Sequence, residues 1–203
     1  MLVLLISTIG EPIDAEGDVI SKRELIDIAE RARRYEPEAF ARLFDLYFER
    51  LRRYAYYRTG DINMAEDLAA EVLTKALESI GNFSERGGTI GAWMFGIARN
   101  LLAREREAAR KVEIAELDEE LPVAEEERTE DLVLVRLSHE ELYKALRKLP
   151  EEQREVILLR FMERYDVKTV AGIMEKKPGA VRALQFRAIV ALKESFKVSE
   201  SLS

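Results

Sequence analysis

Apolar residues recur at every third or fourth position along most of this chain, which is the period of one face of an α-helix. Signals for strands are almost absent. Ser21 and Glu24 form a capping box, which predicts a helix that continues to about Arg34. Pro37 then stands where the first turn of a second helix tolerates proline. The apolar stripe of this second helix consists of Phe40, Leu43, Phe44, Tyr47, Leu51 and Tyr54.

A break at Gly60 and Asp61 separates the second helix from a third, which Asp61 or Asn63 is placed to cap. The stripe of the third helix consists of Leu68, Val72, Leu73, Ala76, Leu77 and Ile80. We expect Gly81 to end this helix as a C′ glycine. Residues 82–90 contain two adjacent glycines and are typical of a loop, and a fourth helix is expected after them.

The C-terminal part of the chain repeats the helical pattern with a distinctive turn. Asp166 is placed to cap a short helix over residues 167–174. Residues 176–179 form a turn before a last helix over residues 180–196. A short helix, a tight turn and a longer helix match the helix-turn-helix, whose second helix enters the major groove of DNA. The predicted fold class is therefore all-α, with two small helical domains.

The charge of the chain is distributed unevenly. Its 203 residues are 47% hydrophobic and 35% charged, with a net charge of −7. Residues 1–20 hold four acidic and no basic side chains, and residues 112–131 hold ten acidic and one basic. We interpret these segments as a tail and a solvated linker, although such a linker can also cover a basic surface of the same chain. The domains over residues 21–111 and 132–203 carry a basic excess, so the acidic total does not exclude a nucleic-acid partner.

The composition also limits the chemistry of the chain. It has no cysteine, which excludes disulfides and thiolate ligands, and one histidine, His139, so a zinc site would have to be rich in carboxylates. The apolar residues 1–10 are too short to span a membrane and have no basic region before them. We expect a cytoplasmic protein without membrane insertion, metal, cofactor or catalytic residues.

The last helix is the best candidate for a binding site. Residues 176–197 hold six basic side chains and one acidic side chain, and Arg182 and Arg187 can share one exposed side. Arginine suits the reading of DNA because its fork bonds guanine O6 and N7 together. A solvated amphipathic helix is the alternative, and the position of the turn favours DNA binding over it.

Two other clusters are ambiguous from the residues alone. Glu66 or Asp67 can share a helix face with Glu71, which fits a solvated face or a protein contact better than a metal or acid–base site. Trp93 follows the glycine-rich loop and fits either the core or a platform for single-stranded nucleic acid. We interpret Trp93 as a core residue.

The motifs AEDLAAEV, W…IARN and LP..QREV..LR occur in this order, and the combination is specific although each motif alone is weak. With these motifs the chain resembles the sigma-70 family of bacterial RNA polymerase sigma factors, in its compact extracytoplasmic-function (ECF) group. Most of residues 36–111 looks like sigma region 2, and most of residues 138–196 looks like sigma region 4. The resemblance implies a non-catalytic subunit that directs promoter recognition and transcription initiation.

The resemblance also implies partners and the residues that meet them. Core RNA polymerase would bind through its β′ clamp coiled coil and β flap, and an anti-sigma factor is a further partner that the resemblance allows. The residues implied near the β′ clamp are Glu66, Asp67, Leu68, Glu71 and Val72. Those implied at the −10 element, where loop 84–90 would hold a flipped base, are Phe83, Arg99, Asn100 and Arg104. Those implied at the −35 element are Arg182, Ala183, Phe186 and Arg187, with Lys168 and Lys177 on phosphates.

Region 4 departs from its relatives at two places. The turn is basic and contains proline, and Ala183 stands where serine is common, so the preferred −35 sequence stays open. Two other functions also remain as alternatives. One is a helix-turn-helix regulator that acts without polymerase, and the other is an interaction protein that mimics a sigma factor.

Overall fold

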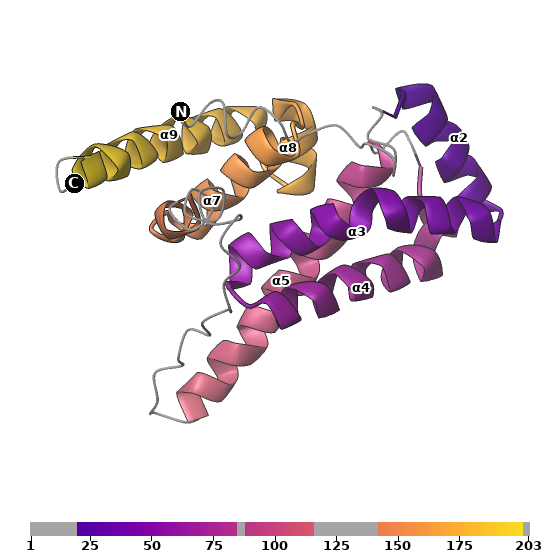
Figure 1. The fold of residues 1–203 in the computed structure, drawn as a ribbon, viewed down its shortest axis with the longest axis horizontal. Helices are drawn as coiled ribbons and strands as arrows, with labels where there is room; N and C mark the ends of the chain where they lie inside the picture. The colour runs from indigo at the N-terminus through magenta and orange to yellow at the C-terminus, as the bar shows by residue number, and fades with distance from the viewer. Residues whose placement is uncertain (1–19, 85–87, 116–141, 201–203) are drawn as a thin grey trace, which may run out of the picture.

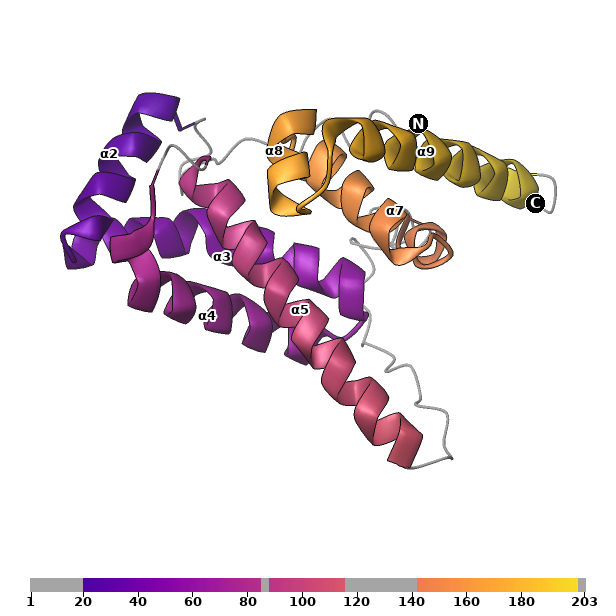
Figure 2. The same cartoon turned by 180° about the vertical axis from the view of Figure 1, so that it is seen from behind.

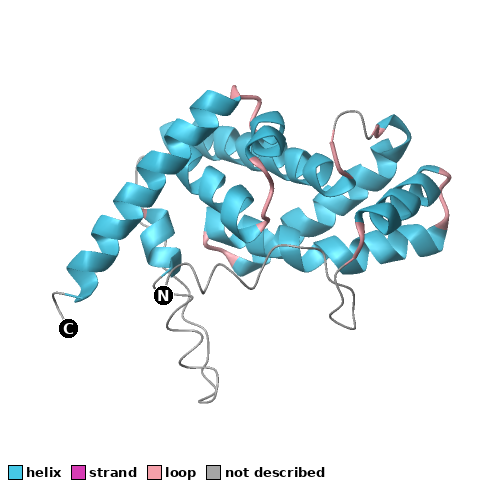
Figure 3. Ribbon diagram, turned by 90° about the horizontal axis from the view of Figure 1, so that it is seen from above, coloured by secondary structure: helices cyan, strands magenta, loops and turns pink. Residues whose placement is uncertain are grey.

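A computed structural model describes residues 20–84, 88–115 and 142–200, and every regular element within these ranges is helical (Figure 3). The N-terminal elements are α2 (Lys22–Arg33), α3 (Pro37–Thr59), α4 (Ile62–Ser79), the 3₁₀ turn η1 (Ile80–Asn82) and α5 (Ile90–Ala115). After residues 142–147, which are helical, come α7 (Glu151–Ile157), the π-helical η4 (Leu158–Met162), α8 (Val167–Ile173) and α9 (Pro178–Glu200). The predicted all-α class is confirmed.

The N-terminal domain is built on the pair α3 and α4, which lie side by side, with α5 packed against both (Figures 1 and 2). Helix α2 closes one end of this group. The face of α3 that carries Leu43, Tyr47 and Leu51 is buried, and Val72 of α4 and Phe95 of α5 are fully buried against it. The burial of these large side chains holds the three long helices together.

The predicted helix starts in this domain are confirmed. The Ser21 hydroxyl accepts a hydrogen bond from the Glu24 amide at 3.2 Å, and Pro37 occupies the first turn of α3. The Asp61 carboxylate accepts from the amides of residues 63 and 64. Gly60 ends α3 with φ +83°, a left-handed conformation that side chains rarely adopt. These local signals therefore place the boundaries of the first three helices.

Three expectations for this domain were wrong. Phe44 is 46% exposed and Leu77 is 40% exposed. Each directly follows a buried residue, Leu43 or Ala76, and a step of one residue turns a side chain by ~100° around a helix, away from the core. Gly81 is not a C′ glycine, because α4 continues directly into η1, which contains Gly81. The described glycines with a positive φ angle are Gly60 and Gly88.

The C-terminal domain packs α8 and α9 around the buried α7–η4 segment. Asp166 caps α8 as predicted, and its carboxylate accepts a hydrogen bond from the Thr169 amide at 2.7 Å. Glu175 turns the chain with φ +53° before the last helix. That helix begins at Pro178 instead of the expected residue 180, because proline fits the first turn of a helix.

We expect Asp166→Ala to destabilise the helix-turn-helix. The hydrogen bond from the Thr169 amide lowers the pKa of Asp166, so this carboxylate stabilises the folded chain above its unfolded pKa of about 3.9. The cost of the substitution should be about 1 kcal/mol at neutral pH and should shrink as pH falls below ~4. Urea unfolding followed by circular dichroism measures it, with Asp45→Ala on the exposed side of α3 as control. An equal loss of unfolding free energy at neutral pH and below pH ~4 would show that the Asp166 carboxylate does not cap α8.

Candidate nucleic-acid and protein interfaces

The recognition helix α9 has one buried face and one exposed face. Its buried side chains are Val181, Leu184, Ala188 and Leu192. The four residues predicted to read the −35 element, Arg182, Ala183, Phe186 and Arg187, are all exposed. Phe186 is 70% exposed, the highest value among the exposed large hydrophobic side chains of the described chain. The helix therefore presents two guanidinium groups and an aromatic ring to solvent.

The two lysines predicted to touch phosphates are also exposed. Lys168 stands in the first turn of α8, and Lys177 directly precedes α9. The neighbouring Lys176 is held instead by Glu152, with 2.7 Å between its Nζ and a carboxylate oxygen. The structure thus brings the six predicted −35 residues to the surface of one motif, and their contact with DNA remains a prediction.

The residues predicted for the −10 element divide into two groups. Asn100 and Arg104 of α5 are exposed. Arg99 has a side chain that is 26% exposed, and its Nε lies 3.3 Å from a carboxylate oxygen of Glu155 in the other domain. The described chain therefore offers Asn100 and Arg104 freely, whereas Arg99 is engaged.

Phe83 needs a different assignment. It is 4% exposed and packs against Trp93 with 5.3 Å between ring centroids. Its side chain therefore supports the loop from below and does not contact a DNA strand directly. Trp93 is half-buried at the edge of the core, which agrees with its interpretation as a core residue. Residues 85–87 of the loop lie outside the described residues.

The five residues predicted to meet polymerase on α4 differ in their exposure, and their contact with polymerase stays a prediction. Glu66, Asp67 and Glu71 are exposed on this helix. Leu68 is 4% exposed and Val72 is completely buried, because both point into the core between the helices. They position the acids, and only the acids can meet a partner directly.

An exposed apolar groove was missed by the sequence analysis. It lies between the end of α2, the start of α3 and the end of α4, and its lining residues are Tyr35, Glu36, Pro37, Phe40, Ala41, Phe44 and Leu77. The sequence could have indicated this groove through the width of the apolar stripes, because Phe44 and Leu77 lie at the edges of those stripes. This groove continues the exposed face of α4 toward its C-terminal end.

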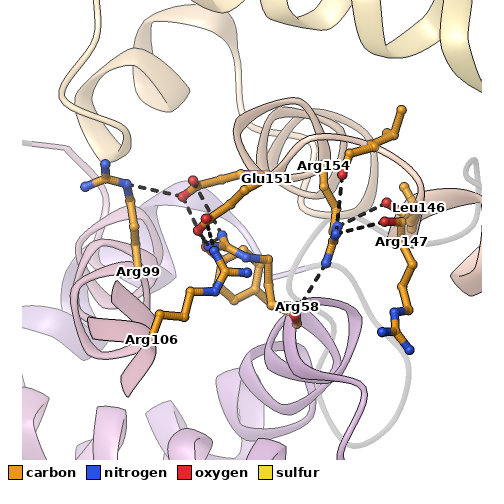
Figure 4. A network of polar contacts seen from close by, with 10 residues as sticks. Arg58, Arg99, Arg106, Leu146, Arg147, Glu151 and Arg154 are labelled. Carbon is orange, nitrogen blue, oxygen red and sulfur yellow. Dashed lines mark hydrogen bonds and ion pairs between the residues drawn. The ribbon is translucent and has the colours of Figure 1, made fainter. Parts of the chain in front are cut away.

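A network of polar contacts between the two domains was also missed (Figure 4). Glu155 of α7 has a side chain that is 4% exposed. Its carboxylate oxygens lie 3.4 Å from Nη1 of Arg58 and 3.3 Å from Nε of Arg99. Glu151, one turn earlier, pairs with Arg58 at 2.5 Å and with Arg106. Arg154 donates from the same helix to the Arg58 carbonyl oxygen at 3.4 Å. Burial raises the pKa of Tyr54, whose hydroxyl donates to Glu155.

A second ionic contact joins the domains closer to the middle of α3. Glu163 has a side chain that is 2% exposed, and its carboxylate lies 2.6 Å from Arg50 and 3.8 Å from Arg53. The Arg50 guanidinium also lies over the ring of Tyr47, at 5.1 Å from the centroid. Burial raises the pKa of Tyr47 to about 12, so this ring stays neutral at physiological pH.

The described residues contain no group of three or more side chains arranged to hold a metal ion. Among the helices that the structure describes, none combines the length and apolar composition needed to cross a membrane. The surfaces described above are therefore the candidate sites: an exposed helix-turn-helix, an exposed part of α5, and the acidic and apolar faces of the N-terminal domain.

Comparison with known proteins assigns both domains. The chain matches the family model of Sigma-70 region 2 over residues 43–112 and that of Sigma-70, region 4 over residues 139–192. The solved structure of the sigma factor RpoE from Bartonella quintana, in complex with the anti-sigma factor NepR, is similar with a TM-score of 0.63 and 26% identity. That similarity covers 78% of this chain and 97% of that chain.

Two relatives agree with these matches. The ECF RNA polymerase sigma factor BldN of Streptomyces coelicolor is 41% identical over 170 residues, which are 83% of this chain and 64% of that protein. The ECF RNA polymerase sigma factor EcfG of Rhodopseudomonas palustris is 32% identical over 139 residues, which are 68% of this chain and 74% of that protein. This chain therefore belongs to the ECF group of the sigma-70 family of RNA polymerase sigma factors.

Proposed function

We propose that this chain is a non-catalytic promoter-specificity subunit, which binds core RNA polymerase in the cytoplasm and directs it to promoters. The observation that carries the proposal is the pairing of an exposed, basic helix-turn-helix with a region 2 domain that presents an acidic face. A simple DNA-binding regulator needs the first feature but has no use for the second. Membership of the ECF group supports the same function.

Region 4 reads the −35 element as duplex DNA in this proposal. Arg182 and Arg187 of α9 would enter the major groove, where a guanidinium fork can bond both acceptors of one guanine. The ring of Phe186 lies between them on the exposed face and suits contact with a thymine methyl group. Lys168 and Lys177 would fix the position of the motif through phosphates, which set register without reading sequence.

Region 2 acts on the −10 element through α5. Asn100 and Arg104 are exposed there and can bond bases or phosphates of a separated strand. Arg99 joins them once Glu155 releases it. Phe83 and Trp93 support the loop that precedes α5, which is where we place a flipped base.

Glu66, Asp67 and Glu71 form the polymerase contact on α4, and they call for a basic partner surface such as the β′ clamp coiled coil. The neighbouring groove at Phe44 and Leu77 supplies apolar area beside these charges. The contact of region 4 with the β flap and the existence of an anti-sigma partner rest on likeness alone. The proposed anti-sigma partner follows from the similarity to RpoE, whose structure was solved in complex with an anti-sigma factor.

Run-off transcription with purified core polymerase on a library of promoters tests the proposal. We expect discrete transcripts that depend on this chain and share −10 and −35 sequences. Core polymerase without the chain is the control. Tight binding to promoter duplex together with no transcripts would instead identify a regulator that acts without polymerase.

Arg187→Ala should weaken recognition of the −35 element by about 1–3 kcal/mol if its guanidinium makes a bidentate contact with a base. Electrophoretic mobility shifts of the holoenzyme on promoter duplexes measure this loss. Lys193→Ala is the control, because Lys193 is exposed on the same helix almost two turns further on. An unchanged −35 footprint for Arg187→Ala would remove this residue from the reading face.

Glu71→Lys should weaken binding to core polymerase about tenfold or more, since it reverses a charge at the proposed contact. Titration of labelled chain with core polymerase measures the affinity. Glu30→Lys, which reverses an exposed charge on α2, is the matched control. Leu68→Ala should instead cost about 2–5 kcal/mol of unfolding free energy, because it removes a buried side chain. Equal affinities of Glu71→Lys and the control would exclude Glu71 from the interface.

A further inference from the structure

The apolar groove lies where the end of α2, the start of α3 and the end of α4 meet (Figure 1). Tyr35, Phe44 and Leu77 are 60%, 46% and 40% exposed in it, and they are three of the five large hydrophobic side chains that the described chain exposes. The volume of the groove is about 500 Å³, within the ~300–1,000 Å³ of typical binding sites. Phe48 extends the apolar surface, because its ring stacks on Phe44 with 4.9 Å between centroids. A surface of this kind is typical of an interaction site.

The lining of the groove offers no free charge to an occupant. Glu36 is the one charged residue of the lining. One oxygen of its carboxylate accepts a hydrogen bond from Nε of Arg31 at 2.8 Å, and the other accepts from Nε of Arg34 at 3.0 Å. A charged ligand would therefore lose water in the groove without gaining a partner of opposite charge. The groove suits an uncharged, apolar occupant.

Residues 1–10, with the sequence MLVLLISTIG, have the composition of such an occupant. None of them has a charged side chain, and seven are large and apolar: Met1, Leu2, Val3, Leu4, Leu5, Ile6 and Ile9. Burial of one leucine, valine or isoleucine side chain is worth about 1.5–3 kcal/mol relative to its exposure. Burial of a few of these side chains can therefore offset the conformational entropy that the segment loses on docking.

The connecting residues are long enough to bring this segment to the groove. Ile20 is buried just before α2, and this helix, Lys22–Arg33, ends two residues before Tyr35 of the groove. Its 12 residues make it about 18 Å long at ~1.5 Å per residue. Residues 11–19 span up to about 30 Å when extended. The connector therefore exceeds the distance that it has to cover.

The charges of the connector favour a path along α2. Residues 11–19 hold four acidic and no basic side chains, whereas residues 22–34 hold five basic and three acidic ones. Arg33 and Arg34 are exposed at the end of α2 beside the groove. Opposite charges attract each other over about 8 Å at physiological ionic strength. A short tether also gives the chain's own segment an advantage over the segment of a second copy, because docking within one chain needs no encounter.

Residues 1–19 lie outside the described residues, and we propose that residues 1–10 dock in the apolar groove of the same chain. Their side chains would cover Tyr35, Phe44 and Leu77, and the acidic connector would follow α2. This docking does not depend on the proposed function. One consequence does rest on it: because Phe44 and Leu77 border the proposed polymerase contact, core polymerase would displace the segment when it covers the groove.

An environment-sensitive dye reports the docking in the full-length chain. The sequence has no cysteine, so Ser7→Cys provides a unique attachment point within the segment. The groove variant is Phe44→Ser/Leu77→Ser. The matched control is Phe186→Ser/Val190→Ser, which makes the same kind of change at two exposed apolar positions of α9. We expect blue-shifted emission in the parent and the control, and the emission of the dye in water in the groove variant. Circular dichroism should show the same helix content in all three chains.

A synthetic peptide of residues 1–19 measures the affinity of the segment. Fluorescence anisotropy follows its binding to a chain that lacks residues 1–10 and retains every described residue. A short connector gives the tethered segment an effective concentration of about 1 mM, so a Kd of about 0.1 mM for the peptide corresponds to about 90% docking in the full-length chain. We expect the full-length chain to bind the peptide about tenfold more weakly, because its own segment competes. Phe44→Ser/Leu77→Ser in the shortened chain should abolish binding.

Unchanged dye emission in a folded groove variant would overturn the proposal. If that variant loses helix content, Leu2→Ser/Leu5→Ser tests the same contact without altering a described residue, and unchanged emission there would also overturn the docking. Emission that changes with chain concentration would assign the groove to the segment of a second copy and would overturn docking within one chain.

Removal of residues 1–10 should raise the affinity for core polymerase about tenfold, since polymerase then meets an open groove. Titration of labelled chain with core polymerase measures this gain. Equal affinities would refute the displacement by polymerase, whereas the dye emission, measured without polymerase, decides the docking itself. Failure of run-off transcription with a docked segment would refute only the proposed function.

Discussion

The arrangement of the two domains depends on the pairing of buried carboxylates with arginines. A carboxylate that loses contact with water must find charged or hydrogen-bonding partners, and removal of one partner of such a pair costs about 3–5 kcal/mol. Glu155 and Glu163 meet this requirement across the domain boundary. Their partners Arg50 and Arg58 lie about two turns apart on α3, so region 4 is held against region 2 at two separate points. Each domain therefore sets the orientation of the other.

The folds within the domains rest on a different kind of interaction and can be predicted from the sequence to a large extent. A capping side chain such as Ser21 or Asp61 accepts a hydrogen bond from an amide two or three residues away. A cap can therefore be predicted from a few adjacent residues of the sequence. The helix-turn-helix is similarly local, with Asp166 before α8 and Pro178 at the start of α9. For the same reason, all six residues expected on the −35 side were found at the surface.

Sequence reasoning failed where burial depends on which residues of an apolar stripe face the core and which lie at its edge. Leu68 and Val72 stand beside exposed acids in the sequence, but they lie on the inner side of α4. Phe44 was expected in the core and is exposed. Phe83 was expected at the −10 element and is buried. The pairing of Arg99 with Glu155 joins residues 56 positions apart, and no periodic pattern within one helix contains that information.

The contact between the domains treats the two proposed DNA-binding surfaces unequally. Arg182 and Arg187 are exposed in it, whereas Arg99 is held by Glu155. The proposed duplex contact of region 4 therefore uses side chains that the contact between the domains leaves exposed. The proposed −10 contact of region 2 competes with Glu155 for Arg99, because one guanidinium group that is held by a carboxylate is less available to a phosphate.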